Sequence, residues 1–205
     1  MELREALSQI SEIRAQVART ETFRGYRSLT VGFTGALAFA AAGLQPLVAP
    51  DPAEHARPYL VLWVSAAALS LIAAGAELCV RGYASSSMLA RQLTSLAVEQ
   101  FLPCIAAGAV VTVAVATRAV DRLWMLPGLW SVLFGLGIFA SCRLLPRMTF
   151  FVGMYYLFCG AVLLIVAEPA FALSPVAMAM TFGVGQLSAA AILYFHLERS
   201  YDSAQ

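Results

Sequence analysis

Six long apolar stretches, separated by short polar segments, make up most of the chain. They cover residues 29–46, 59–80, 93–117, 123–141, 148–167 and 176–196. Each has about 18 to 25 residues, the length at which an α-helix rising about 1.5 Å per residue crosses about 30 Å of hydrocarbon. Backbone polar groups in lipid must be satisfied within their own segment, and no alternating strand pattern is visible. We therefore expect an all-α fold, a bundle of six transmembrane helices over residues 27–200.

The first 26 residues follow a different pattern. Leu3, Leu7, Ile10, Ile13 and Val17 recur at helical spacing, with charged residues and glutamines on the other faces. This predicts a cytoplasmic amphipathic helix over residues 1–26. Its glutamates nearly balance its arginines, which favours packing against protein over packing against anionic lipid. The helix either folds back on its own bundle, binds a second copy or a cytoplasmic protein partner, or lies on the lipid surface.

The basic residues predict the orientation of the spans. All thirteen are arginines, because the chain contains no lysine. With the N-terminus inside, only Arg57, Arg118 and Arg122 fall outside, and the other ten flank the cytoplasmic ends. This positive-inside bias places both termini, including the tail 201–205, in the cytoplasm of a multi-pass protein of the inner (plasma) membrane. The net charge of +1 gives no argument for a nucleic-acid partner. The expected partner is the lipid bilayer, because the apolar stretches are long enough to cross it.

Aromatic side chains gather near the predicted outer ends of the spans. Tyr59, Trp63, Trp124, Trp130 and Phe171 all occupy such positions. Tyrosine and tryptophan are enriched where a bilayer meets water, because their rings are apolar and their tips are polar. The pattern predicts an aromatic belt at the outer interface.

A weak internal repeat links the first and fourth stretches. Gly35, Phe39, Ala40, Leu44 and Pro46 recur at the same spacing as Gly135, Phe139, Ala140, Leu144 and Pro146. Three helices in each half would make the halves cross in opposite directions, the 3+3 inverted repeat of several transporter folds. The competing explanation is that glycine, alanine, leucine and phenylalanine are common in any membrane helix.

The candidate site residues are the polar residues within or beside the apolar stretches: Glu77, Arg91, Ser95, Glu99, Gln186 and His196. Arg91, Ser95 and Glu99 lie four apart on one helical face, and Pro103 predicts a kink just beyond them. Charges in a bilayer normally face the bundle interior or water, and they are normally paired. These residues therefore either surround a cytoplasm-facing vestibule for a cation or proton, or form ion pairs that position the helices. Gln186 is the usual kind of interhelical hydrogen-bonding residue.

Other chemistry lacks its essential residues. Without lysine there is neither Schiff-base chemistry nor a P-loop, and no GxSxG is present. The two histidines are predicted at opposite faces, and the four cysteines have no metal-ligand spacing. We expect no metal, no cofactor and no enzyme activity.

Two function classes fit these patterns. One is a regulatory or adaptor protein, self-associating or binding a partner through its cytoplasmic face. The other is a small transporter or channel that uses the polar residues around Arg91, Ser95 and Glu99. The outer halves of the third and fourth stretches contain almost nothing polar except Thr112 and Ser131. This is a poor route for an ion, and it favours an adaptor or the transport of an apolar solute.

Overall fold

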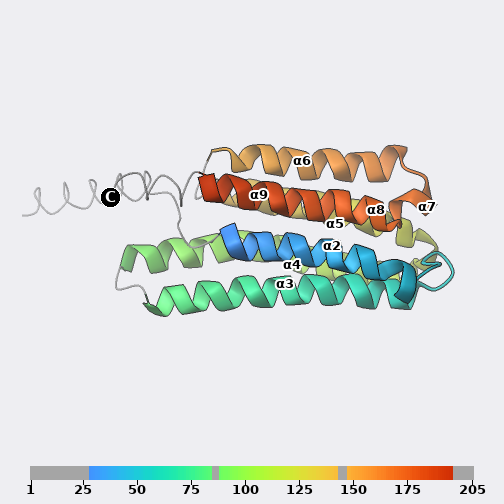
Figure 1. The fold of residues 1–205 in the computed structure, drawn as a ribbon, viewed down its shortest axis with the longest axis horizontal. Coiled ribbons are helices and arrows are strands. Elements are labelled where there is room, and N and C mark those ends of the chain that lie inside the picture. Colours follow the sequence, from blue (N-terminus) through green and yellow to red (C-terminus); the bar gives the residue numbers. More distant parts are fainter. Residues whose placement is uncertain (1–27, 85–87, 143–146, 196–205) are drawn as a thin grey trace, which may run out of the picture.

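The computed structural model describes the backbone of residues 28–84, 88–142 and 147–195, and their side chains except for those of 81–94 and 97. Within these ranges the chain is helical and has no strand. Six helices are long and apolar enough to cross a membrane, and they lie side by side in one bundle (Figure 1). The predicted all-α fold with six spans is confirmed, as expected of a multi-pass membrane protein. The predicted helix 1–26, the tail 201–205 and His196 lie outside the described residues.

The helices follow the apolar stretches closely. The first three spans are α2 (Ser28–Val48), α3 (Ala56–Ala84) and α4 (Met88–Arg118). The fourth begins with the 3₁₀ turn η1 (Val120–Met125) and continues as α5 (Leu126–Ser141), and the fifth is α6 (Thr149–Ala161) with the π-helical η2 (Val162–Val166). After the short α7 (Pro169–Ala172), the last span comprises α8 (Pro175–Met178), the π-helical η3 (Ala179–Val184) and α9 (Gly185–Leu193). α4 continues through Pro103 as one helix.

The main helix contacts form two similar sets. α2 packs against α3 and α9, whereas α5 packs against α6 and α4. The first helix of each half thus lies between the second helix of its own half and the last helix of the other half. α3 and α4 are consecutive in the chain but make few contacts with each other. The predicted inverted repeat stays a prediction.

Small residues bring α5 and α6 into close contact. A Cβ atom at Gly128 would lie 3.1 Å from the carbonyl oxygen of Gly160, and one at Gly135 would lie 3.1 Å from that of Gly153. Between these two points of close contact, the buried Ser131 hydroxyl donates a 2.6 Å hydrogen bond to the Tyr156 carbonyl oxygen. Such close backbone approach gives van der Waals contact where lipid supplies no hydrophobic force between helices.

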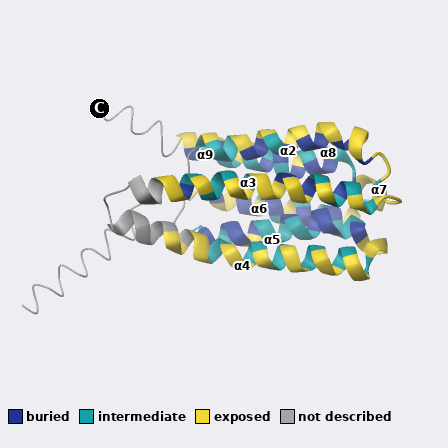
Figure 2. Cartoon of the chain, turned by 90° about the horizontal axis from the view of Figure 1, so that it is seen from below, coloured by how far each residue is buried: buried dark blue, intermediate teal, exposed yellow. Residues whose placement is uncertain are grey.

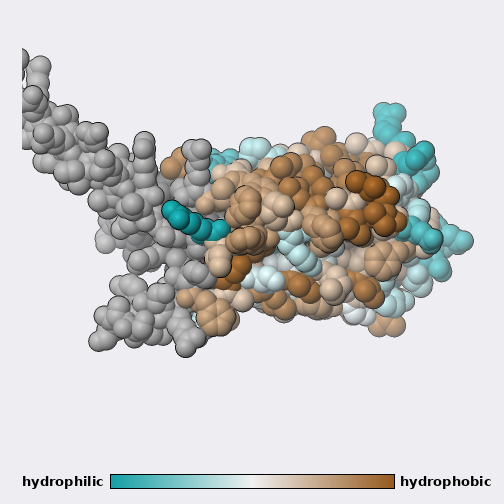
Figure 3. Space-filling model, turned by 90° about the horizontal axis from the view of Figure 1, so that it is seen from above, coloured by the Kyte–Doolittle hydropathy of each residue, from teal (hydrophilic) through white to brown (hydrophobic). Residues whose placement is uncertain are grey.

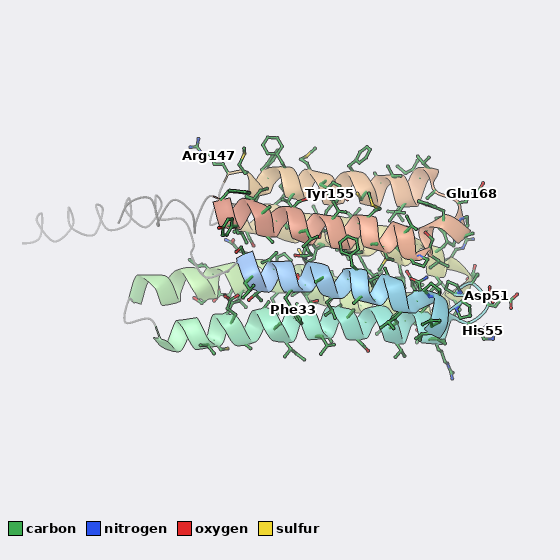
Figure 4. The ribbon with its side chains drawn as sticks, in the orientation of Figure 1. Phe33, Asp51, His55, Arg147, Tyr155 and Glu168 are labelled. Carbon is green, nitrogen blue, oxygen red and sulfur yellow. The ribbon has the colours of Figure 1, made fainter. Side chains whose placement is uncertain are left out.

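The surface of the bundle is an apolar band with polar ends. Large apolar side chains are exposed along every long helix, for example Phe33, Ile72 and Phe158, and the space-filling view shows the band (Figure 3). Asp51, His55 and Glu168 lie at the end where α2 finishes, and Arg147 lies at the end where α2 begins (Figure 4). We name these the predicted outer end and the predicted cytoplasmic end, since the orientation itself stays a prediction.

The predicted aromatic belt is wrong for two of its members. Tyr59 is 0% exposed and Trp63 is 5% exposed, so both belong to the core at the predicted outer end. Trp63 is held there because its Nε1–H donates to Gln45 Oε1 at 3.0 Å. Gln45 in turn donates to the Leu173 carbonyl oxygen at 2.7 Å. The polar part of the Trp63 ring therefore bonds to protein instead of interfacial water.

Candidate functional site

A cavity of about 700 Å³ lies within the bundle. α2, α3, α4, α5 and the last span all contribute to its wall, together with the first turn of α6. On α3 the lining extends from Trp63 to Leu78, and on α4 from Val98 to Val113, each roughly 22 Å at about 1.5 Å per residue. The cavity is thus elongated along the helices, and its volume lies within the range of about 300–1,000 Å³ typical of small-molecule sites.

The exposed large apolar residues of the described cavity lining lie on α3 and α4. They are Val64, Leu71, Val98, Leu102 and Val113. No residue in the most apolar window of the α4 span is buried, and Figure 2 shows exposed and intermediate residues along α3 and α4, with few buried ones. A molecule in the hydrocarbon layer would reach the cavity from the side of these two helices.

Small side chains create the empty space. α3 contributes four alanines to the lining, and each of α3 and α4 contributes one glycine. A Cβ atom added at Gly75 or at Gly108 would meet nothing within 4 Å. These glycines differ from those between α5 and α6, because they face a void instead of a neighbouring backbone.

The lining is apolar and carries no charged side chain among the described residues. Its polar members are Thr30, Thr34, Ser70, Thr112, Ser141, Thr149, Gln186 and the indoles of Trp63 and Trp130. Since a charge in such a setting would be unpaired and desolvated, the cavity suits a neutral molecule.

Toward the predicted outer end, the polar groups of the lining are bonded within the protein. Trp130 Nε1–H donates to Thr112 Oγ1 at 2.8 Å, and Thr112 donates to the Gly108 carbonyl oxygen at 2.7 Å. Trp63 is bonded to Gln45, as described above. Nearer the middle of α3, the Ser70 hydroxyl donates to the Ala66 carbonyl oxygen of its own helix at 2.9 Å.

The predicted cytoplasmic end has a different character. Thr30 is near the start of α2, Ser141 is the last residue of α5, and Thr149 is the first of α6, so three helices bring lining hydroxyls to this end. Ser141 is only 5% exposed, and its Oγ has no hydrogen-bond partner among the described residues. A buried hydroxyl without a partner costs free energy, so it marks a position where a partner would be favourable.

A π-helical segment lies beside the cavity. η3 replaces the regular α-helix between Met178 and Gln186, two lining residues of the last span. The Met180 carbonyl oxygen within it accepts a 2.5 Å hydrogen bond from the Tyr155 hydroxyl of α6. Single π turns inside helices occur frequently at functional sites.

Of the four candidate residues whose side chains the structure describes, only Gln186 lies on the cavity lining. Glu77 is half-buried on α3, and Ser95 and Glu99 are exposed on α4; none of the three lines the cavity. The side chain of Arg91 and the whole of His196 lie outside the described residues. The vestibule predicted around Arg91, Ser95 and Glu99 thus stays a prediction, separate from the cavity.

Sequence reasoning missed the residues that define the cavity. Gly75, Gly108 and Ser141 are small residues within apolar stretches, and nothing in the pattern separates them from packing residues. The one signal was the lack of polar residues in the outer halves of the third and fourth stretches, which favoured an apolar solute.

Metal chemistry finds no support in the part of the chain that the structure describes, where no group of three potential metal ligands lies together. The thiols of Cys79, Cys104, Cys142 and Cys159 are free, and Cys104 lines the cavity.

No protein family matches the chain, and no curated protein or solved structure is significantly similar to it.

Proposed function

We propose that this protein binds a lipid-like, largely apolar molecule in the cavity between α3, α4 and the rest of the bundle, as a small carrier or receptor for such a molecule within the membrane. The observation that carries this proposal is an elongated cavity that no charged side chain lines among the described residues, and whose exposed large apolar lining residues belong to α3 and α4. It is the apolar-solute form of the transporter hypothesis.

The physical gain from binding is packing. Lipid chains are as apolar as the lining, so a ligand gains little hydrophobic free energy by leaving the bilayer for the cavity. The side chains around a void, however, lack contact atoms on one side, and a fitted chain restores those dispersion contacts. Selectivity among apolar ligands then depends on how well the shape of each ligand fits the cavity, and an elongated cavity fits an elongated chain.

An ion is a poor occupant of the same cavity. Ion pathways are built from charged side chains, rings of carbonyl groups or water-filled passages. Here the hydroxyls of Thr34, Ser70 and Thr112 already donate to carbonyl oxygens of their own helices. Among the described residues no charged side chain lines the cavity to balance an ion, so an ion would lose hydration for which the few lining hydroxyls and Gln186 compensate poorly.

The regulatory or adaptor hypothesis depends on residues 1–26, which lie outside the described residues. It stays a separate hypothesis about the cytoplasmic face. Cavity binding neither requires nor opposes it.

A bulky residue in the cavity tests the proposal. Gly108→Phe places a ring where a Cβ meets nothing within 4 Å, so we expect the protein to fold and to lose about tenfold in affinity for an apolar chain, about 1.4 kcal/mol. The probe is a sixteen-carbon alkane carrying a diazirine, with photolabelled positions mapped by mass spectrometry in the purified full-length protein.

Gly43→Phe is the matched control, because Gly43 is an exposed glycine of α2 with nothing within 4 Å of an added Cβ and does not line the cavity. Unchanged labelling in this variant is expected. If the alkane fails to label α3 and α4 in the wild-type protein, or if both phenylalanine variants label alike, the cavity is not a binding site.

Cys104 offers an independent measurement. It lines the cavity, whereas Cys79 on α3 is exposed and does not. In proteins that retain only one of these cysteines, a sixteen-carbon alcohol is expected to slow maleimide labelling of Cys104 severalfold, because the bound chain covers the thiol. Labelling of Cys79 should not change, and equal slowing of both thiols would indicate a general effect on the bilayer or micelle.

A further inference from the structure

The two ends of the cavity differ in their hydrogen bonding. At the predicted outer end, Trp130, Thr112 and Trp63 are all bonded within the protein. At the predicted cytoplasmic end, the Ser141 hydroxyl is buried, lines the cavity and has no partner among the described residues. A ligand with one polar group would therefore be oriented by the cytoplasmic end.

The surroundings of Ser141 indicate the chemistry of that polar group. Thr30 and Thr149 line the same end, so the nearby polar groups are hydroxyls. The lining of the described residues includes no arginine, aspartate or glutamate, and a charged head buried there would be left without a counter-ion. A small neutral group fits, since it can exchange hydrogen bonds with hydroxyls at little desolvation cost.

We propose that the ligand is an uncharged amphiphile, one long apolar chain with a small hydrogen-bonding head such as a hydroxyl or a carbonyl, whose head accepts a hydrogen bond from Ser141. Its chain extends along α3 and α4 toward Trp63 and Trp130. This proposal rests on the proposed function and adds the class and the orientation of the ligand.

The competing occupant of the position beside Ser141 is a water molecule. A buried water normally makes about three hydrogen bonds to polar groups that would otherwise be unsatisfied. If water alone satisfies Ser141, removing the hydroxyl changes nothing in ligand discrimination. The experiment therefore measures discrimination between heads and does not rely on affinity alone.

Three diazirine probes with the same sixteen-carbon chain are compared on the full-length protein: the alkane, the primary alcohol and the carboxylate. In the wild-type protein we expect the alcohol to label at about fivefold lower concentration than the alkane, the effect of one hydrogen bond of about 1 kcal/mol. The carboxylate should be the weakest. Ser141→Ala should remove the advantage of the alcohol and leave alkane labelling unchanged.

Ser131→Ala is the matched control. Ser131 is a buried serine of the same helix, but its hydroxyl donates to the Tyr156 carbonyl oxygen and it does not line the cavity. This variant should lower stability and keep the alcohol preference, whereas Ser141→Ala should keep stability.

The outcomes separate the two proposals. One outcome is that the alcohol and the alkane label equally and that Ser141→Ala changes neither. Water alone then satisfies Ser141, and the inference about the head of the ligand is overturned, while the apolar site stands. Strongest labelling by the carboxylate would overturn the neutral class. If none of the probes labels α3 and α4, the proposed function itself fails.

Discussion

Replacing Gly160 by alanine is expected to lower the free energy of unfolding by about 1–3 kcal/mol, the usual cost of forcing an extra methyl group into a packed interior. A Cβ atom there would lie 2.6 Å from Val132 Cγ2, 2.9 Å from the Gly128 carbonyl oxygen and 3.1 Å from the Val132 nitrogen. Two of these atoms belong to the backbone of α5, so a change of side-chain rotamer cannot relieve the contact. The two helices must move apart, which also weakens their other contacts.

Gly43→Ala serves as the control for this prediction. It makes the same chemical change in a transmembrane helix, but the new methyl group meets nothing within 4 Å. Any gain in helix propensity is common to both variants, so their difference reports the contact between α5 and α6. Unfolding by sodium dodecyl sulfate, followed by circular dichroism, measures it. Equal stability of the two variants would show that α5 and α6 are not in close contact at Gly160.

Replacing Gln45 by leucine is expected to cost about 2–6 kcal/mol of stability, because it leaves two buried groups without partners at about 1–3 kcal/mol each. Gln45 is 2% exposed and joins three segments: α2, which contains it, α3 through Trp63, and the turn after α7 through the Leu173 carbonyl oxygen. Leucine has a similar size but neither accepts from the Trp63 N–H nor donates to Leu173. The loss should therefore come from hydrogen bonding more than from packing.

A double-mutant cycle tests the mechanism. Trp63→Phe removes the indole N–H, so it should cost less in the Gln45→Leu protein than in the wild-type protein. Ser70→Ala is the control, since its hydroxyl donates only to the Ala66 carbonyl oxygen of its own helix, and we expect little change. Additive effects of the two substitutions would show that Gln45 and Trp63 do not bond to each other.

Two polar residues of the spans illustrate the limits of the sequence pattern. Gln186, in the middle of an apolar span, is the kind of residue that the pattern marks as interhelical, and it lies on the cavity lining. Gln45 has no such signal, because a glutamine one residue before Pro46 resembles the end of a span, yet it is among the most buried polar residues. Proximity to a predicted helix end is therefore a poor guide to exposure, since turns such as that at Leu173 can cover the end and supply partners.

The sequence by itself determined the number of spans, their lengths and their polar ends. In hydrocarbon, backbone groups can be satisfied only within a helix or a closed barrel, so runs of about 20 apolar residues predict helices whatever their packing. The structure confirms six such helices over the described residues.

Only the tertiary structure decided which apolar residues touch and which surround empty space. Gly108 and Gly160 are both glycines within apolar spans, but one faces the cavity and the other presses against a neighbouring backbone. In a soluble protein, polar residues would mark the outward face of each helix. A membrane span is apolar toward lipid, toward its neighbours and toward a cavity, so its sequence does not distinguish these three surroundings, and the packing of the whole bundle is needed to do so.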